Sequence, residues 1–235
     1  MKGFFSAHGK LLLSGEYFVL DGALGLALPA NYGQHLALFA KPDSPNSLHW
    51  KSYTSSGNCW FEATFAFPER EILHTTARSV SDTLLKILGI LQERAPVFNE
   101  TIRSGLQIRT YLDFPENWGL GSSSTLISCL AQSTGINPFE LLDATMGGSG
   151  YDIACAQARG PLLYQKPSFV NIPFRPSFHR QLYFVHLGHK QNSREGIARY
   201  RAAGRAPQKL IDSISKLSLA LAAAETQQHF DRILI

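Results

Sequence analysis

The stretch that most constrains this chain runs from Trp118 to Thr125 (WGLGSSST). It follows Gly105–Leu112, where apolar and polar residues alternate as in a strand, and it precedes Leu126–Ala131, an apolar run with serines in front. A loop with two glycines therefore joins a strand to a helix N-terminus. Such a loop lets the backbone approach a ligand closely, and the helix start presents unpaired N–H groups with a partial positive charge.

These properties suit a bound phosphate, because helix N-termini attract anions. Ser122, Ser123 and Ser124 add three hydroxyls that can donate hydrogen bonds or ligate a metal. The same residues also fit an ordinary serine-capped helix start, and on this stretch alone that alternative stays open. The loop is not a Walker A motif, since no lysine follows its glycines, and it is not a Rossmann fingerprint.

Composition sets the broad class of protein. The chain has 235 residues, with 44% hydrophobic and 17% charged residues, which indicates a globular protein of one large or two small domains. The net charge of +4 is scattered, so nucleic acid is not an expected partner. Cys59, Cys129 and Cys155 lack metal-ligand spacing and predict reduced thiols in the cytoplasm. No run reaches the roughly 20 apolar residues of a membrane span, so we expect no membrane partner.

The N-terminal part of the sequence has the pattern of short strands separated by frequent turns. We expect strands at Gly3–Ala7 and Lys10–Leu13 with a turn at His8-Gly9 between them. Ala23–Leu28 and His35–Phe39 continue the β pattern. With the helices that follow, this opening predicts an α+β protein.

The rest of the chain alternates helices and strands. Ser79–Glu93 has apolar residues at helical spacing, and Ala95–Ser104 reads as a connection. Further strands are expected at Leu48–Ser52, Trp60–Phe67 and Gln181–Leu187, a hairpin at Pro161–Gln165 and Phe169–Ile172, and helices at Phe139–Thr145, Tyr151–Ala158, Leu210–Ala224 and His229–Ile235.

Three strings occur in an order that resembles the motifs of the GHMP small-molecule kinases. They are Gly9–Tyr17 (GKLLLSGEY), Pro115 with Gly-Leu-Gly-Ser-Ser four residues later, and Gly148–Ala154 (GSGYDIA). Gly150–Ala154 matches a bacterial subgroup of that family. A looser fourth string, Lys190-x-x-Ser193-Arg194, is similar to the segment on the family's substrate side, and it also fits a plain capped basic helix.

The resemblance implies a two-domain GHMP kinase-like fold. Residues 1–175 would form a nucleotide-binding domain of ribosomal-protein-like βαβ type, and residues 176–235 an incomplete ferredoxin-like domain. The family's third glycine-rich motif, near the C-terminus, has no match here. We therefore expect a shortened second domain whose helices leave apolar residues exposed, and hence self-association or poor solubility.

The resemblance also assigns roles to residues, with ATP and Mg²⁺ as cofactors. Gly119, Leu120, Gly121, Ser122, Ser123 and Ser124 would hold the phosphates, with Ser123 also as the Mg²⁺ ligand. Asp152 would be the base and Lys10 its electrostatic partner, while Glu16 and Ser193 would lie on the substrate side. Glu140 and Asp143 are candidates for an acidic Mg²⁺ ligand, although no motif fixes either.

Other functions remain open at this point. By itself, Asp152 also fits a simple partner of the helix dipole, and Lys10 an exposed hairpin charge. The resemblance implies a kinase that phosphorylates a hydroxyl of a small-molecule alcohol, with the mevalonate branch, and so isoprenoid biosynthesis, as the nearest match. The alternatives are a nucleotide-binding remnant without turnover and a decarboxylase of the mevalonate-diphosphate type.

Overall fold

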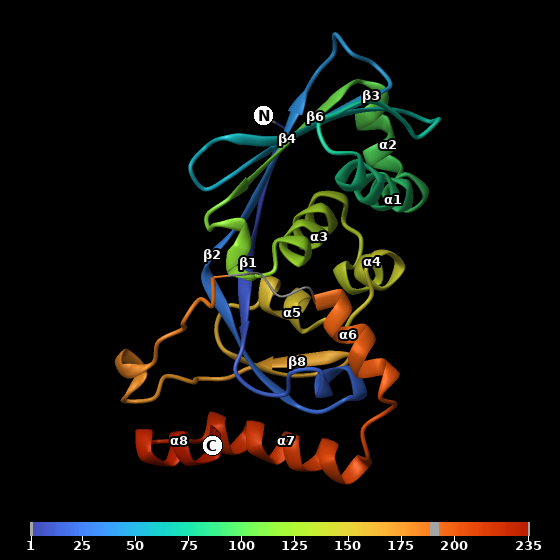
Figure 1. Ribbon diagram of the computed structural model, residues 1–235. Helices are drawn as coiled ribbons and strands as arrows, with labels where there is room; N and C mark the ends of the chain where they lie inside the picture. Colours follow the sequence, from blue (N-terminus) through green and yellow to red (C-terminus); the bar gives the residue numbers. More distant parts are fainter. Residues whose placement is uncertain (1, 189–192, 235) are drawn as a thin grey trace. The chain divides into compact units, whose positions relative to one another are not determined.

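The structure is a computed structural model that describes residues 2–188 and 193–234 (Figure 1). Its contacts divide the chain into two compact units, each assembled from separate stretches of sequence. Unit 1 comprises Met1–Ala7, Tyr32–Glu116 and Ser122–Gly147, and unit 2 comprises His8–Asn31, Asn117–Gly121 and Gly148–Ile235.

Unit 1 combines a mixed sheet with four helices. Its strands are part of β2 (Gly25–Ala40), β3 (Ser47–Tyr53), β4 (Cys59–Ala66), β5 (Glu71–Thr75) and β6 (Leu106–Leu112), and its helices are α1 (Arg78–Arg94), α2 (Pro96–Arg103), α3 (Ser122–Thr134) and α4 (Pro138–Thr145). The strand order is β5-β4-β3-β6-β2. Leu48 of β3 lies opposite Leu106 of β6 in a parallel pair, whereas β2 and β6 are antiparallel. The parallel pair requires a crossover connection, which β4, β5, α1 and α2 supply.

The core of unit 1 follows from the side-chain period of its strands. Leu106, Ile108, Thr110 and Leu112 of β6 are buried, while the residues that alternate with them are partly exposed. The buried stripe of α1 includes Leu84 and Leu88, at the spacing of one helix face. Full burial of each such side chain stabilises the fold by about 1.5–3 kcal/mol.

Unit 2 contains the first half of β2 and the C-terminal helices. Its further elements are the second half of β1 (Gly3–Leu12), whose first half belongs to unit 1, η1 (Phe18–Asp21), part of η2 (Glu116–Trp118), α5 (Tyr151–Gln157), β7 (Leu162–Gln165), β8 (Ser168–Asn171), η3 (His179–Gln181), α6 (Ser193–Ala202), α7 (Gln208–Ala222) and α8 (Gln227–Leu234). β2 pairs with β1 and, antiparallel, with β7, which forms a hairpin with β8.

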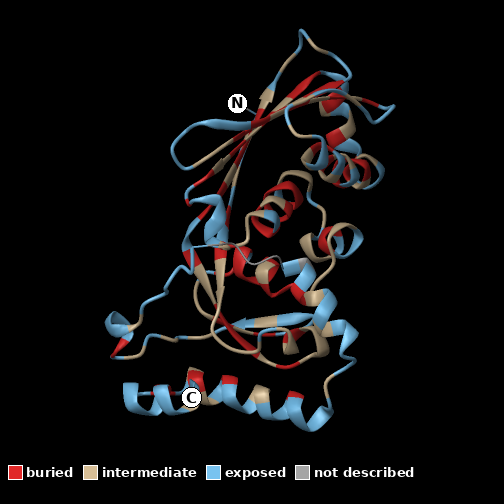
Figure 2. Ribbon diagram, in the orientation of Figure 1, coloured by how far each residue is buried: buried red, intermediate tan, exposed pale blue. Residues whose placement is uncertain are grey.

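Helices α7 and α8 pack onto the β2 side of unit 2. Ser218 Oγ donates to Leu24 O over 2.6 Å, and Leu24 N donates to Ser215 Oγ over 3.0 Å. Phe178, Leu221 and Phe230 belong to one buried apolar cluster. Figure 2 shows buried and exposed residues interleaved along α7.

Most of the expected elements are confirmed. One eight-stranded sheet and eight α-helices in the described residues make this an α+β protein, as predicted. Helix α1 and the β7–β8 hairpin lie where the sequence placed them. Within the described residues, no helix is both long and apolar enough to span a membrane.

Some local predictions were wrong. His8-Gly9 is not a turn, because β1 runs unbroken from Gly3 to Leu12 and His8 Nδ1 bonds to Ala30 O over 3.1 Å. β2 is likewise one strand, Gly25–Ala40. The expected connection Ala95–Ser104 contains α2, with Pro96 in its first turn, where a proline suits a helix.

The strand expected at Gln181–Leu187 is also absent: residues 182–187 have no regular structure. The apolar residues that suggested it are exposed, Tyr183 by 83% and Val185 by 79%. The expected exposure of apolar residues on the C-terminal helices is observed at Leu217 and Leu219 of α7. Self-association itself stays a prediction.

Candidate active site

The Gly-Leu-Gly loop is fixed to strand β1. Lys10 N donates to Leu120 O over 3.0 Å, and Leu120 is buried. Gly119 and Gly121 both have positive φ, at 73° and 89°. A Cβ at Gly121 would lie 3.1 Å from Cγ of Lys10, whereas one at Gly119 would meet no atom within 4 Å. The loop backbone and the Lys10 side chain are therefore in close contact, and the second glycine is what permits it.

The three serines form the first turn of α3, directly after Gly121 in the chain. That turn contains no acidic residue. Ser123 is exposed, while Ser124 is buried. Thr125, the next residue, donates to Gln34 Oε1 over 2.7 Å and anchors the helix within unit 1. Of the three serines, Ser123 is thus the most accessible to a ligand.

Lys10 lies against the aromatic ring of Tyr151. Its Nζ is 5.3 Å from the ring centroid, within the range of a cation–π contact. Tyr151 is the first residue of α5 and is 9% exposed. Burial raises the pKa of Tyr151 well above its ordinary value, and the negative charges of Glu16 and Asp152 raise it further. Tyr151 therefore stays a neutral surface against which the Lys10 cation is held.

Asp152 occupies the first turn of α5, after Gly150 with φ 89°. Its Oδ1 accepts a hydrogen bond from Ile153 N over 3.1 Å. Burial raises the pKa of the Cys155 thiol to about 12; the Asp152 charge adds to this rise and the Lys10 cation opposes it. Lys10 and Asp152 thus act on the same buried thiol from within unit 2, and so lie in one electrostatic neighbourhood.

Glu16 and Ser193 are carried by segments that touch. Tyr17, next to Glu16, stacks on Tyr200 of α6 with ring centroids 5.7 Å apart. A Cβ at Gly196 would overlap the Tyr17 ring, so the two segments are in direct contact. Glu16 is exposed and α6 begins at Ser193.

Asp21 links η1 to α6 and to the residues that follow α6 through hydrogen bonds. Its Oδ2 accepts from Tyr200 Oη over 2.7 Å and from Ala206 N over 2.9 Å. These two hydrogen bonds lower the pKa of Asp21, since both favour its charged form. Lys190, the first residue of the Lys-x-x-Ser-Arg string, lies outside the described residues.

Among residues 2–188 and 193–234, acidic side chains do not form a preformed metal site. In the described part of the chain, no group of three or more His, Cys, Asp or Glu side chains could hold a metal ion. Glu140 and Asp143 are exposed on α4, within unit 1. This is compatible with Mg²⁺, which usually takes one or two protein oxygens and completes its shell with phosphates and water.

Sequence reasoning missed several residues that shape the site. Tyr151 was expected only as part of a motif, although it supports the Lys10 cation. Tyr17 was likewise quoted only within a motif, and Tyr200 and Asp21 were given no role, although all three hold α6 in place. A tyrosine directly before the candidate Asp was the one available signal, and nothing local pointed to Asp21.

Comparison with known proteins by sequence gives no match: no family model fits the chain, and no curated protein is similar to it. Comparison by structure is informative. The chain is similar to the mevalonate kinase of Methanococcus jannaschii, with TM-score 0.63 and 12% identity over 99% of this chain and 76% of the other.

Two further solved structures extend this similarity. One is the phosphomevalonate kinase of Streptococcus pneumoniae in complex with phosphomevalonate and AMPPNP, with TM-score 0.63, 15% identity, and 99% and 77% of the two chains covered. The other is a mevalonate diphosphate decarboxylase from Legionella pneumophila, with TM-score 0.56, 14% identity, and 98% and 73% covered. The chain therefore has the GHMP kinase-like fold, as the motifs predicted.

Proposed function

We propose that this protein is an ATP-dependent kinase that phosphorylates a hydroxyl group of a small, mevalonate-like alcohol. The observation that carries the proposal is the arrangement around Lys10. Its backbone holds the Gly-Leu-Gly loop at Leu120, and its cation lies over Tyr151, the neighbour of Asp152. The loop, the cation and the carboxylate are the three parts that phosphoryl transfer to an alcohol needs, and they occur in a fold shared with such kinases.

The residues present fit ATP and Mg²⁺. The backbone at Gly119 and Gly121 has the positive φ that opens a loop towards phosphates, and the α3 start offers N–H groups without a competing carboxylate. Ser123 offers an exposed oxygen for the metal. When bound, ATP supplies the transferred phosphoryl group and Mg²⁺ neutralises part of its charge.

The remaining chemistry is assigned to this chain's own side chains. Asp152 orients the substrate hydroxyl and accepts its proton as the oxygen becomes bonded to phosphorus. Lys10 offsets negative charge that develops beside it, and the Tyr151 ring restricts its position. Glu16 and Ser193 are assigned to the substrate side, and the contact of Tyr17 with Tyr200, which joins the segments that carry them, supports this assignment.

The test is a coupled assay of ATP turnover against a panel of alcohols: mevalonate, phosphomevalonate, galactose and homoserine. We expect one member to give ADP and a phosphorylated product in equal amounts. ATP binding by calorimetry without product from any member would contradict the proposal and identify a nucleotide-binding remnant.

A second candidate is favoured by the similarity to the mevalonate diphosphate decarboxylase. That activity would release carbon dioxide from a substrate carrying a diphosphate. Analysis for carbon dioxide with mevalonate diphosphate as substrate separates it from a simple kinase, whose products contain none.

Three other expectations remain proposals. They are a division between residues 175 and 176, a cytoplasmic location, and self-association through the exposed residues of α7. The last would appear as a concentration-dependent mass in sedimentation, reduced when the exposed Leu217 and Leu219 are both changed to Ser.

A further inference from the structure

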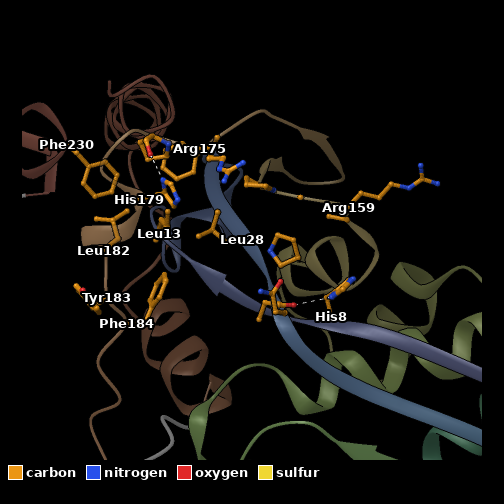
Figure 3. A pocket seen from close by; sticks show the side chains of 18 of the residues that line it. His8, Leu13, Leu28, Arg159, Arg175, His179, Leu182, Tyr183, Phe184 and Phe230 are labelled. Carbon is orange, nitrogen blue, oxygen red and sulfur yellow. Dashed lines mark hydrogen bonds between the residues drawn. The ribbon is translucent and has the colours of Figure 1, made fainter. Parts of the chain in front are cut away.

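Unit 2 contains a cavity whose described lining residues include none of the proposed catalytic or phosphate-binding residues. Its volume is about 540 Å³, within the range of roughly 300–1,000 Å³ typical of small-molecule sites. Figure 3 shows its labelled lining side chains. Most of its wall is apolar, formed by Leu13, Leu28, Phe174, Leu182, Phe184 and Phe230 among others.

Part of this wall belongs to the core of the unit. Leu13, Phe174 and Leu182 pack against the buried cluster that contains Phe230. Phe230 itself is only 3% exposed. Because the packing of α8 and β2 holds these side chains, this part of the cavity keeps its shape without a ligand.

The polar side chains of the cavity are basic or neutral. They include Arg159, Arg175, His8 and His179, and no acidic residue lines the cavity in the described part of the chain. No ion pair is found for Arg175 or Arg159 among the described residues. In Figure 3 the guanidinium of Arg159 extends away from the apolar side chains, whereas Arg175 and His179 lie at the same end as Phe230. An anion is therefore best placed at Arg175 and His179.

His179 is oriented for such a contact by its own turn. Its Nδ1 lies 2.9 Å from Pro176 O. A carbonyl oxygen only accepts, so Nδ1 carries the hydrogen; Nε2 then accepts a hydrogen bond in the neutral ring and donates one to an anion only in the imidazolium form.

The segment after η3 adds apolar surface that is otherwise exposed to water. Tyr183 is 83% exposed and Phe184 57%, and both line the cavity. Large apolar side chains gathered in one exposed segment mark a binding surface. A hydrocarbon chain in the cavity would cover both rings.

We propose that this cavity binds a single-chain amphiphile with an anionic head, a carboxylate or a phosphate. The hydrocarbon chain lies against Leu13, Leu182 and Phe230, and the head is held by Arg175, with the imidazolium form of His179 adding a second donor. This inference does not depend on the proposed kinase activity.

The test uses the whole protein and three probes that share one chain: decanoate, decyl phosphate and decyltrimethylammonium, each below its micelle-forming concentration. Calorimetry should show binding of the two anions and not of the cation. Arg175→Ala should weaken decanoate binding by about tenfold or more, since a charge-assisted contact is lost. Arg180→Ala is the matched control. Arg180 is an exposed arginine of η3, beside His179, and it does not line the cavity.

A second pair of variants tests the hydrocarbon end. Phe184→Ala should weaken binding of decanoate, whereas Val185→Ala, at a more exposed neighbour outside the lining, should not. Both side chains are exposed, so neither variant should unfold the protein. Equal binding of all three probes, no binding of either anion, or equal effects within either pair would overturn the proposal. Binding to phosphatidylglycerol vesicles without binding of free decanoate would also overturn it, in favour of a lipid surface.

Discussion

Two loops in this protein contain glycines with positive φ directly before a helix. The first, Gly119–Gly121, precedes α3, and the second, Gly147–Gly150, precedes α5. Glycines with positive φ occur in both, at 73° and 89° in the first and at 63°, 116° and 89° in the second. Each loop leaves the N–H groups of a helix start without helical partners.

The two helix starts differ in charge. The first turn of α3 contains serines and no acid, whereas the first turn of α5 contains Asp152. A helix N-terminus attracts anions, so the first start can take an anion from outside, while the second already has its own carboxylate. Under the proposed function, the side chains, and not the loop backbone, would decide which loop receives phosphate and which one supplies a base.

The strongest test of this contrast is Asp152→Asn, which keeps the shape but removes the charge. The rate of phosphoryl transfer should fall by about 10²–10⁴, the usual worth of a positioned general base. ATP affinity should change little, because the phosphates are assigned to the other loop. Single-turnover rate and calorimetry on one sample measure both.

A purely structural Asp152 would behave differently. In that case Asp152→Asn would lower the free energy of unfolding by about 0.5–2 kcal/mol, as for a lost helix-start acid or cap. The rate per folded molecule would be unchanged. Asp212→Asn, at an exposed acid of α7, is the control. If Asp152→Asn lowers the melting temperature but leaves the single-turnover rate unchanged, Asp152 is not the base.

Lys10→Met tests whether the carboxylate and the cation act as one unit. We expect the rate to fall by about 10², as when one electrostatic donor to a transition state is removed. The double variant with Asp152→Asn should lose less than the two effects multiplied together. Strictly multiplicative losses in single-turnover kinetics would show that the two residues act independently.

Gly121→Val probes the first loop. Both Gly121 and Gly119 have positive φ, but only at Gly121 would a Cβ meet the Lys10 side chain. ATP affinity should therefore fall by about tenfold or more in Gly121→Val, with a smaller loss in Gly119→Val. Calorimetry with ATP compares the two variants, and equal affinity in Gly121→Val and the unchanged protein would remove this loop from the phosphate site.

Ser123→Ala tests whether the Ser123 hydroxyl, rather than that of Ser122 or Ser124, ligates the metal. Turnover should fall by about tenfold, the worth of one charge-assisted contact, with a smaller change in ATP affinity. Ser122→Ala and Ser124→Ala are the comparisons. If Ser123→Ala has normal kinetics and one of the others does not, the metal ligand has been assigned to the wrong serine.

The smallest expected effect concerns the buried thiols of Cys129 in α3 and Cys155 in α5. Burial raises the pKa of Cys129 in α3 and of Cys155 in α5 to about 12, above their usual value of about 8.5 in an unfolded chain. The fold therefore favours both neutral thiols, and this stability is lost as pH rises from about 9 towards 12. Native protein near pH 8 should react with iodoacetamide at Cys59, which is exposed, and not at the other two. Mass spectrometry of the labelled peptides checks this.

Much of the fold was predictable because it follows from local patterns. The alternation in β6 and the helical spacing in α1 both correspond to faces that are buried. The glycine positions also predicted the two loops, since few other residues adopt positive φ. Motif order then predicted the fold that the comparison of structures bears out.

What could not be predicted depends on contacts between distant residues. β1 and β2 continue through residues that look like turns, since pairing between strands overrides local preference. Tyr151 supports Lys10 across about 140 residues of sequence, and Asp21 holds Tyr200 across 179. No local pattern carries such information.

The hydrogen bonds between α7 and the β2 region have a consequence for synthesis on the ribosome. Leu24 and Ser215 are separated by 191 residues, and Ser14 and Ser218 by 204. At about 5–20 residues per second, the early segment waits on the order of 10–40 s for these partners. During that interval the backbone N–H and C=O of Leu24 lack the serine partners that α7 later provides, so chaperone capture at this segment should decide how much of the newly made protein folds rather than aggregates.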